Sequence, residues 1–172
     1  MKALINKISI SLKKDGSDKN CRAWANFIVK NKIAITDLHP LIHAEHPVAM
    51  RFSWLLGGIC ESNPKLVYPS IIYFFSNRDK IEILNFNRSL AKMFCYCGVP
   101  DEIEGEAMDN MFKWLSDPKS IVSTKNFAMS ALYNFTIKYP ELKNELRTII
   151  EEQLDKNSLS FQKQARKLLE KL

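Results

Sequence analysis

The last 32 residues, ELKNELRTIIEEQLDKNSLSFQKQARKLLEKL (141–172), carry the clearest periodicity of the chain and decide its fold. In the first half, apolar residues recur at three- and four-residue spacing with charged residues between them: Leu142, Leu146, Ile149, Ile150 and Leu154. This spacing predicts an amphipathic helix. After a polar break, with Ser158 or Ser160 as its N-cap, the pattern returns at Phe161, Ala165, Leu168, Leu169 and Leu172. The chain is therefore predicted to close with a pair of helices.

Three upstream segments are apolar on most sides: residues 48–60, 88–97 and 123–138. A more one-sided helix is predicted after each of them, at 65–76, 102–115 and 141–154. The three segments end shortly before Pro64, Pro100 and Pro140, which are 36 and 40 residues apart. This period is typical of solenoids built from stacked helix pairs. Residues 21–31, with Trp24, Phe27 and Ile28, and the final helix are expected to belong to the end pairs.

These elements predict an all-α fold, an α-α superhelix of about four to five helix pairs and about 70% helix. The alternation and hairpin turns that a β-sheet requires are missing. No linker or low-complexity tract interrupts the 172 residues. We therefore expect one domain over residues 1–172.

Several of these stretches resemble a small bacterial HEAT-like repeat family of about this length. The residues that carry the resemblance are Pro140 through Leu154, Ser160–Leu169 (SFQKQARKLL), Met111–Asp117 (MFKWLSD) and Ala128–Leu132 (AMSAL). The resemblance extends from about Lys19 to the end of the chain. It implies a HEAT- or armadillo-like solenoid, and because the matching positions are packing residues, it implies no catalytic group.

The N-terminus does not read as a secretion signal, since Lys7 lies inside its apolar stretch and no small-residue cleavage site follows. The longest uncharged apolar runs are about half of what a bilayer span needs. A cytoplasmic protein without a membrane partner is therefore expected. The cysteines, Cys21, Cys60, Cys95 and Cys97, are then expected to be reduced and to pack as small hydrophobes.

Positive charge gathers at both ends of the chain. Residues 1–35 contain eight basic and two acidic side chains and thus account for the whole net charge of +6. Near the other end, lysines follow one another at every fourth residue. Together these segments give a candidate basic interaction surface: Lys13, Lys14, Lys19, Lys163, Lys167 and Lys171. Such a surface attracts phosphate backbones or an acidic protein, and the alternative is that these lysines form solvated outer faces.

His39, His43 and His46 have the i, i+4, i+7 spacing of zinc ligands on one helical face. Pro40 and Pro47 directly follow two of them and push those histidines out of helical geometry. We therefore expect a short helix with ordinary polar histidines and predict no metal and no cofactor. The Cys95-Tyr96-Cys97 spacing is likewise too tight for a structural zinc pair.

Other candidate motifs have structural explanations. Gly57-Gly58 has neither the strand nor the Gly-Lys-Ser/Thr of a phosphate loop, so a close helix crossing is expected. The glutamates that follow Pro100 suit the positive end of a helix better than acid–base catalysis. The three tryptophans fit apolar helical patterns, so core packing is expected unless one is exposed and anchors a partner.

No catalytic constellation emerges from the sequence. The first hypothesis is a non-enzymatic helical-repeat scaffold that holds a protein partner, whose identity the sequence does not give. The alternative is a nucleic-acid-binding HEAT-like module that uses the basic N- and C-terminal helices.

Overall fold

The computed structural model describes all residues from 1 to 172 and is 78% helical, with no strand. The predicted all-α class is thus confirmed. Four short 3-10 helices accompany the α-helices: η1 (Ile35–His43), η2 (Tyr68–Ser70), η3 (Arg78–Lys80) and η4 (Asp101–Ile103). The ten α-helices are α1 (Lys2–Lys14), α2 (Asp18–Lys30), α3 (Val48–Ser62), α4 (Pro64–Val67), α5 (Ile71–Ser76), α6 (Phe86–Cys97), α7 (Glu104–Ser116), α8 (Val122–Lys138), α9 (Leu142–Leu154) and α10 (Leu159–Leu169).

The helices fall into two compact units, residues 1–97 and 98–172. In the first unit, α1 pairs with α2, η1 with α3, and the α4–α5 segment with α6. In the second unit, α7 pairs with α8 and α9 with α10. The five pairs agree with the predicted four to five. None of the helices combines the length and the apolar character that crossing a membrane requires.

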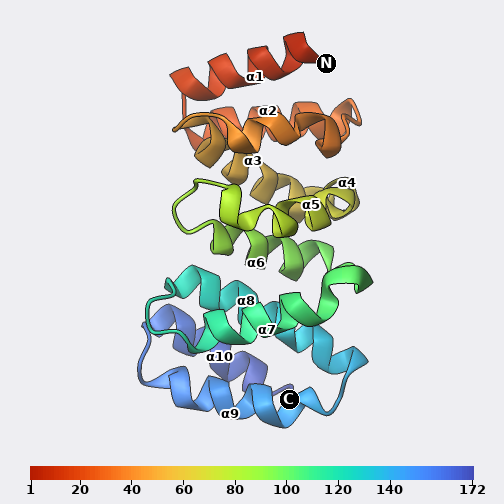
Figure 1. Ribbon diagram of the computed structural model, residues 1–172. Coiled ribbons are helices and arrows are strands. Elements are labelled where there is room, and N and C mark those ends of the chain that lie inside the picture. Colours follow the sequence, from red (N-terminus) through yellow and green to blue (C-terminus); the bar gives the residue numbers. More distant parts are fainter. The chain divides into compact units, whose positions relative to one another are not determined.

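Helix α3 is the centre of the first unit and packs against α2, α6, α4 and η1 (Figure 1). Nine of its 15 residues are buried, which fits a helix covered on several sides. The glycine pair lies where these helices approach. A β-carbon on Gly57 would lie 3.2 Å from Lys92 Nζ of α6, and one on Gly58 would lie 3.9 Å from Ala25 Cβ of α2. Both neighbours are side-chain atoms, the flexible end of a lysine and an alanine at ordinary van der Waals distance, so neither glycine marks the close helix crossing that the sequence predicted.

The predicted helix over 65–76 is not continuous. It is divided into α4, the 3-10 turn η2 and α5, with Pro69 inside the turn. Proline has no N–H to donate, and its ring crowds the carbonyl four residues before it. The backbone therefore tightens at this position, which the apolar pattern alone does not reveal.

Helix α8 is the centre of the second unit, in contact with α7, α9 and α10 (Figure 1). Its buried residues share one broad face. Phe127 and Tyr133 are half-buried and Ile137 is exposed, so α8 is enclosed on fewer sides than its apolar sequence predicted. The predicted helix ends hold, because α3, α6 and α8 stop at Ser62, Cys97 and Lys138, each two or three residues before a proline. The N-terminal residues form the amphipathic helix α1, which buries Ile8 and Leu12.

Candidate basic binding surface

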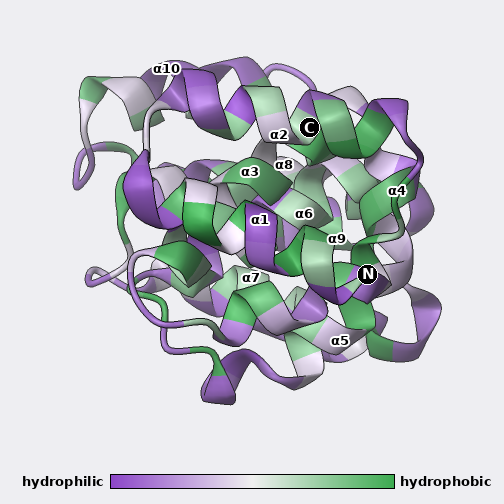
Figure 2. Cartoon of the chain, turned by 90° about the horizontal axis from the view of Figure 1, so that it is seen from above, coloured by the Kyte–Doolittle hydropathy of each residue, from purple (hydrophilic) through white to green (hydrophobic).

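Helix α10 presents an apolar face to the core and a basic face to its surroundings. Phe161, Ala165 and Leu168 are buried, while Lys163, Arg166 and Lys167 are exposed. The three- and four-residue spacing of the apolar set places it on one side of the helix, and the cations occupy the remainder. In Figure 2, α10 is marked by several strongly hydrophilic turns.

Polar contacts fix α10 against α8. Gln164 Nε2 donates hydrogen bonds to the Asn126 carbonyl at 3.0 Å and to Ser130 Oγ at 2.7 Å. Just after the C-terminal end of α10, Lys171 Nζ lies 6.0 Å from the centre of the Tyr133 ring of α8, which is within reach of a cation–π contact. The position of α10 on its neighbour is therefore set at two points along its length.

The opposite side of α10 is tied to α9 and to the turn before α10. Gln162 Nε2 donates to the Asn157 carbonyl at 3.1 Å. Arg147 Nη2 of α9 donates to the Leu169 carbonyl at 3.4 Å, which partners one of the open carbonyls at the C-terminal end of α10. The basic side chains thus rest on a helix held from both sides.

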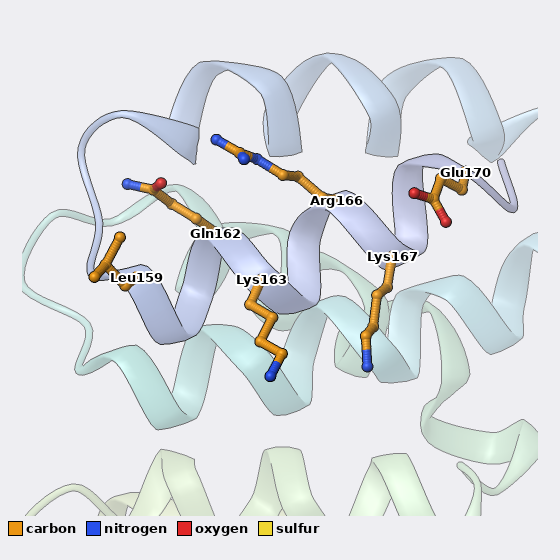
Figure 3. A pocket seen from close by; sticks show the side chains of 6 residues that line it. All are labelled: Leu159, Gln162, Lys163, Arg166, Lys167 and Glu170. Atoms are coloured by element: carbon orange, nitrogen blue, oxygen red, sulfur yellow. The ribbon is translucent and has the colours of Figure 1, made fainter.

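An open hollow of about 420 Å³ runs along the exposed side of α10. Figure 3 shows Lys163 and Lys167 directed to one side of the helix and Arg166 to the other, with Leu159 and Glu170 towards the two ends. Its lining residues belong to α10 or directly follow it: Leu159, Gln162, Lys163, Arg166 and Lys167 in the helix, and Glu170 just after it.

The positive charge of this hollow is local. The second unit as a whole contains 11 basic and 12 acidic side chains, so its net charge is −1, yet α10 itself has three cations and no acid. None of the three cations takes part in an ion pair. Lys138, by contrast, forms ion pairs within the chain, because its Nζ lies 2.8 Å from Glu104 Oε1 and 3.2 Å from Asp101 Oδ1. The α10 cations are therefore available to an external anion.

The predicted basic residues are distributed over both units. Lys163 and Lys167 line the hollow, and Lys171 covers Tyr133 just beyond it. Lys13 and Lys14 end α1 and Lys19 lies in the first turn of α2, all three exposed. That the two groups act as one surface stays a prediction. Arg166 was missing from the predicted set, although its position three residues after Lys163 places it beside that lysine on the exposed side of the helix.

The histidines make hydrogen bonds to neighbouring helices. His39 Nε2 lies 2.9 Å from Ser70 Oγ, and its ring stacks on Tyr73 at 3.8 Å between centroids. His43 Nε2 lies 2.9 Å from the Tyr73 hydroxyl. They belong to a 3-10 helix that contains Pro40, not to an α-helix with a shared face. Burial, with a smaller contribution from nearby His43, lowers the pKa of His39 below its ordinary value.

The glutamates after Pro100 and the three tryptophans were both predicted to have structural roles. Glu104 accepts a hydrogen bond from the Tyr139 hydroxyl at 2.7 Å in addition to its contact with Lys138, so it joins α7 to the end of α8. Trp114 is buried, and Trp24 is partly buried and donates to Ser11 Oγ. Trp54 is 46% exposed, so core packing was the wrong expectation for it.

A family model described as a HEAT repeat domain matches residues 8–172. Comparison with curated proteins and with solved structures gives no match.

Proposed function

The chain belongs to the HEAT repeat domain family, and from this membership we propose that it is a non-enzymatic scaffold that binds an acidic segment of a partner protein along α10. HEAT repeats typically mediate protein interactions, which supports the general part of the proposal. The observation that carries the specific part is the hollow with three cations that have no ion-pair partner within the chain.

The chemistry of the lining favours carboxylates. Arg166 offers a planar guanidinium that can hold a carboxylate with two parallel hydrogen bonds, and Lys163 and Lys167 add mobile point charges. These groups lie within little more than one turn of α10, with Lys163 and Lys167 on one side and Arg166 on the other. An acidic peptide laid along the helix can therefore meet all three cations.

Two further lining residues favour a peptide over a nucleic acid. Leu159 is 81% exposed at one end of the hollow and offers an apolar contact that a phosphate backbone does not use. Glu170 is an exposed acid at the other end and repels a continuous row of phosphates. A peptide can place an apolar residue at the first position and a neutral or basic residue at the second.

The test is fluorescence anisotropy with a labelled glutamate-rich peptide that contains one leucine. The variant Lys163→Ala/Arg166→Ala/Lys167→Ala should bind about tenfold more weakly, since each exposed ion pair contributes about 0.5 kcal/mol. Affinity of the unaltered protein should fall between about 50 and 200 mM salt because exposed charges are screened.

The matched control is Lys113→Ala/Lys119→Ala/Lys143→Ala, which removes the same charge from the same unit outside the hollow. It should retain the peptide affinity. Equal losses in both triple variants, or no peptide binding at low salt, would count against the site. A labelled 20-mer of single- or double-stranded DNA completes the experiment, because tight, salt-sensitive DNA binding without peptide binding would assign the surface to nucleic acid instead.

A further inference from the structure

Helix α1 leaves one of its faces uncovered. It packs on α2, α3 and η1, and it buries Ile8 and Leu12. Figure 1 shows α1 as the outermost helix of the first unit. Ile10 stands midway between the two buried residues in the sequence and is 65% exposed. Because residues two positions apart point to opposite sides of a helix, Ile10 lies at the middle of the uncovered face.

Lysines surround Ile10 on this face. Residues three and four positions apart are neighbours on a helix, and those of Ile10 include Lys7, Lys13 and Lys14, all of them exposed. Helix α1 has a fourth exposed lysine, Lys2, and no acidic residue. None of these lysines takes part in an ion pair within the chain. The uncovered face of α1 is therefore basic, with one apolar side chain at its centre.

Helix α9 of the second unit has the same arrangement of buried residues. It packs on α7, α8 and α10. It buries Leu146 and Ile150, which have the four-residue spacing of Ile8 and Leu12 in α1. Thr148 stands midway between this buried pair and is exposed. Thr148 therefore has the place on α9 that the exposed isoleucine has on α1.

The two helices follow one pattern over nine positions, with opposite charge. The segments are NKISISLKK in α1 (6–14) and NELRTIIEE in α9 (144–152). Both begin with asparagine, and each lysine of the first segment has a glutamate at its place in the second. These glutamates are Glu145, Glu151 and Glu152, all of them exposed. Only Glu151 has a cation close to it, since Arg147 Nη1 lies 3.9 Å from its Oε1. The two exposed faces thus match in spacing and are complementary in charge.

We propose that the exposed face of α1 binds the exposed face of α9 in a second copy of this chain. Both helices have 13 residues, so each offers about 20 Å of length. Lysines at the spacing of the opposing glutamates attract them and set the register of the two helices. The contact also covers Ile10, which can pack on the methyl group of Thr148.

A second copy fits the α1 face better than a nucleic acid does. A phosphate backbone can neutralise the lysines, but it has no apolar group for Ile10, which is the centre of the face. The α9 face supplies the opposite charges at the right spacing and belongs to the same chain. Because the two faces are different surfaces, each copy can bind one neighbour through α1 and another through α9. The contact is therefore heterologous.

The association is weak and depends on salt. A contact between two single helices buries less than the about 1,200 Å² of a stable interface, so high protein concentration is needed. The charges are exposed on both faces, and added salt screens them.

The experiment is sedimentation equilibrium of the full chain between about 10 μM and about 1 mM, the range in which a contact of this size should form. At about 50 mM salt the average mass should rise above that of the monomer as the concentration increases, and at about 500 mM salt it should return to the monomer mass.

Charge-reversal variants test which faces meet. Lys7→Glu/Lys14→Glu reverses the α1 face, and Glu145→Lys/Glu152→Lys reverses the α9 face. Each variant alone should stay monomeric, because its two faces then have the same sign. An equimolar mixture of the two should associate, since opposite charges again face each other between unlike copies. The four substitutions in one chain exchange the two faces and should restore self-association at an unchanged net charge.

The matched control is Lys113→Glu/Lys119→Glu, which makes the same change in net charge on exposed lysines outside α1. It should associate as the unaltered chain does, and far-ultraviolet circular dichroism of every variant checks that the fold is kept.

Three outcomes overturn the proposal. The first is an unaltered chain that stays monomeric at about 1 mM in low salt. The second is a mixture of the two reversed variants that does not associate. The third is a loss of association in Lys163→Glu/Lys167→Glu but not in Lys7→Glu/Lys14→Glu, which would move the contact to α10. If the chain stays monomeric but binds a labelled 20-mer of DNA, and the α1 variant does not, the α1 face belongs to nucleic acid.

Discussion

Lys125, in the first turn of α8, is 2% exposed and is the only charged residue among the buried polar side chains. Its Nζ donates a hydrogen bond to Gln153 Oε1 of α9 at 2.9 Å, so its contact there is with a neutral group. Burial lowers the pKa of Lys125 below the ordinary value of 10.5, against a smaller opposing effect of Asp117. The folded state therefore disfavours the protonated amine.

Replacing Lys125 with methionine should raise the free energy of unfolding at pH 7 by about 1 kcal/mol, because an apolar side chain of similar length removes the cost of burying a charge. Gln153 Oε1 keeps an amide donor in Asn157 Nδ2, at 3.3 Å. Urea unfolding of both proteins measures the difference.

The same pair of proteins gives a pH test with a defined sign. The pKa of Lys125 is lower in the folded state, so the unfolded chain binds more protons below 10.5. The unaltered protein should therefore gain stability relative to Lys125→Met as the pH rises from 7 towards 10.5. A difference that does not change with pH would show that Lys125 is not desolvated.

At the scale of elements, Arg51 of α3 holds the end of α1. Its Nη1 donates to the carbonyls of Leu12 and Lys13, the latter at 3.1 Å, in the last turn of α1. A β-carbon on Gly16 would overlap the Arg51 guanidinium, so a larger residue in the turn between α1 and α2 would displace that side chain. One cation thus caps a helix end and orders the following turn.

Arg51→Met should loosen α1 without unfolding α3. Charged hydrogen bonds to the carbonyls are each worth about 1.5–3 kcal/mol, so amides of α1 should exchange at least tenfold faster. The measurement is hydrogen–deuterium exchange, in which the exchange rates of residues 2–14 in α1 are compared with those of residues 52–60 in α3. The control is Arg22→Met, which removes an exposed arginine paired with Asp18. Equal acceleration in both variants would contradict the capping role of Arg51.

For the whole molecule, we propose that residues 1–172 unfold as one domain. In stacked helical repeats, each pair buries its apolar face only against its neighbours, so the loss of one pair exposes the next. Three tryptophans allow a test, since Trp24 and Trp54 are in the first unit and Trp114 is in the second.

The variant Trp24→Phe/Trp54→Phe keeps Trp114 as its single tryptophan. Its urea unfolding should have the same midpoint when followed by tryptophan fluorescence and by far-ultraviolet circular dichroism. Trp114→Phe, which reports on the first unit, should give coincident curves in the same way. If the fluorescence midpoints of the two variants differ from each other and from the midpoint by circular dichroism, the two units fold separately.

The sequence by itself determined the helical class, the pairing and most helix ends. Apolar spacing and the prolines after α3, α6 and α8 are local signals, and they act through backbone geometry that is the same in any helix. The spacing also placed Lys163 and Lys167 opposite the buried face of α10. Each of these features depends on residues within a few turns of one another.

Only the tertiary structure decided which side chains meet across helices. Trp54 matches an apolar helical pattern but remains exposed, because burial depends on which faces of α3 its neighbours cover. The burial of Lys125 likewise follows from the approach of α9 to α8. Crossing angles and side-chain packing set these contacts, and they arise only when the helices assemble.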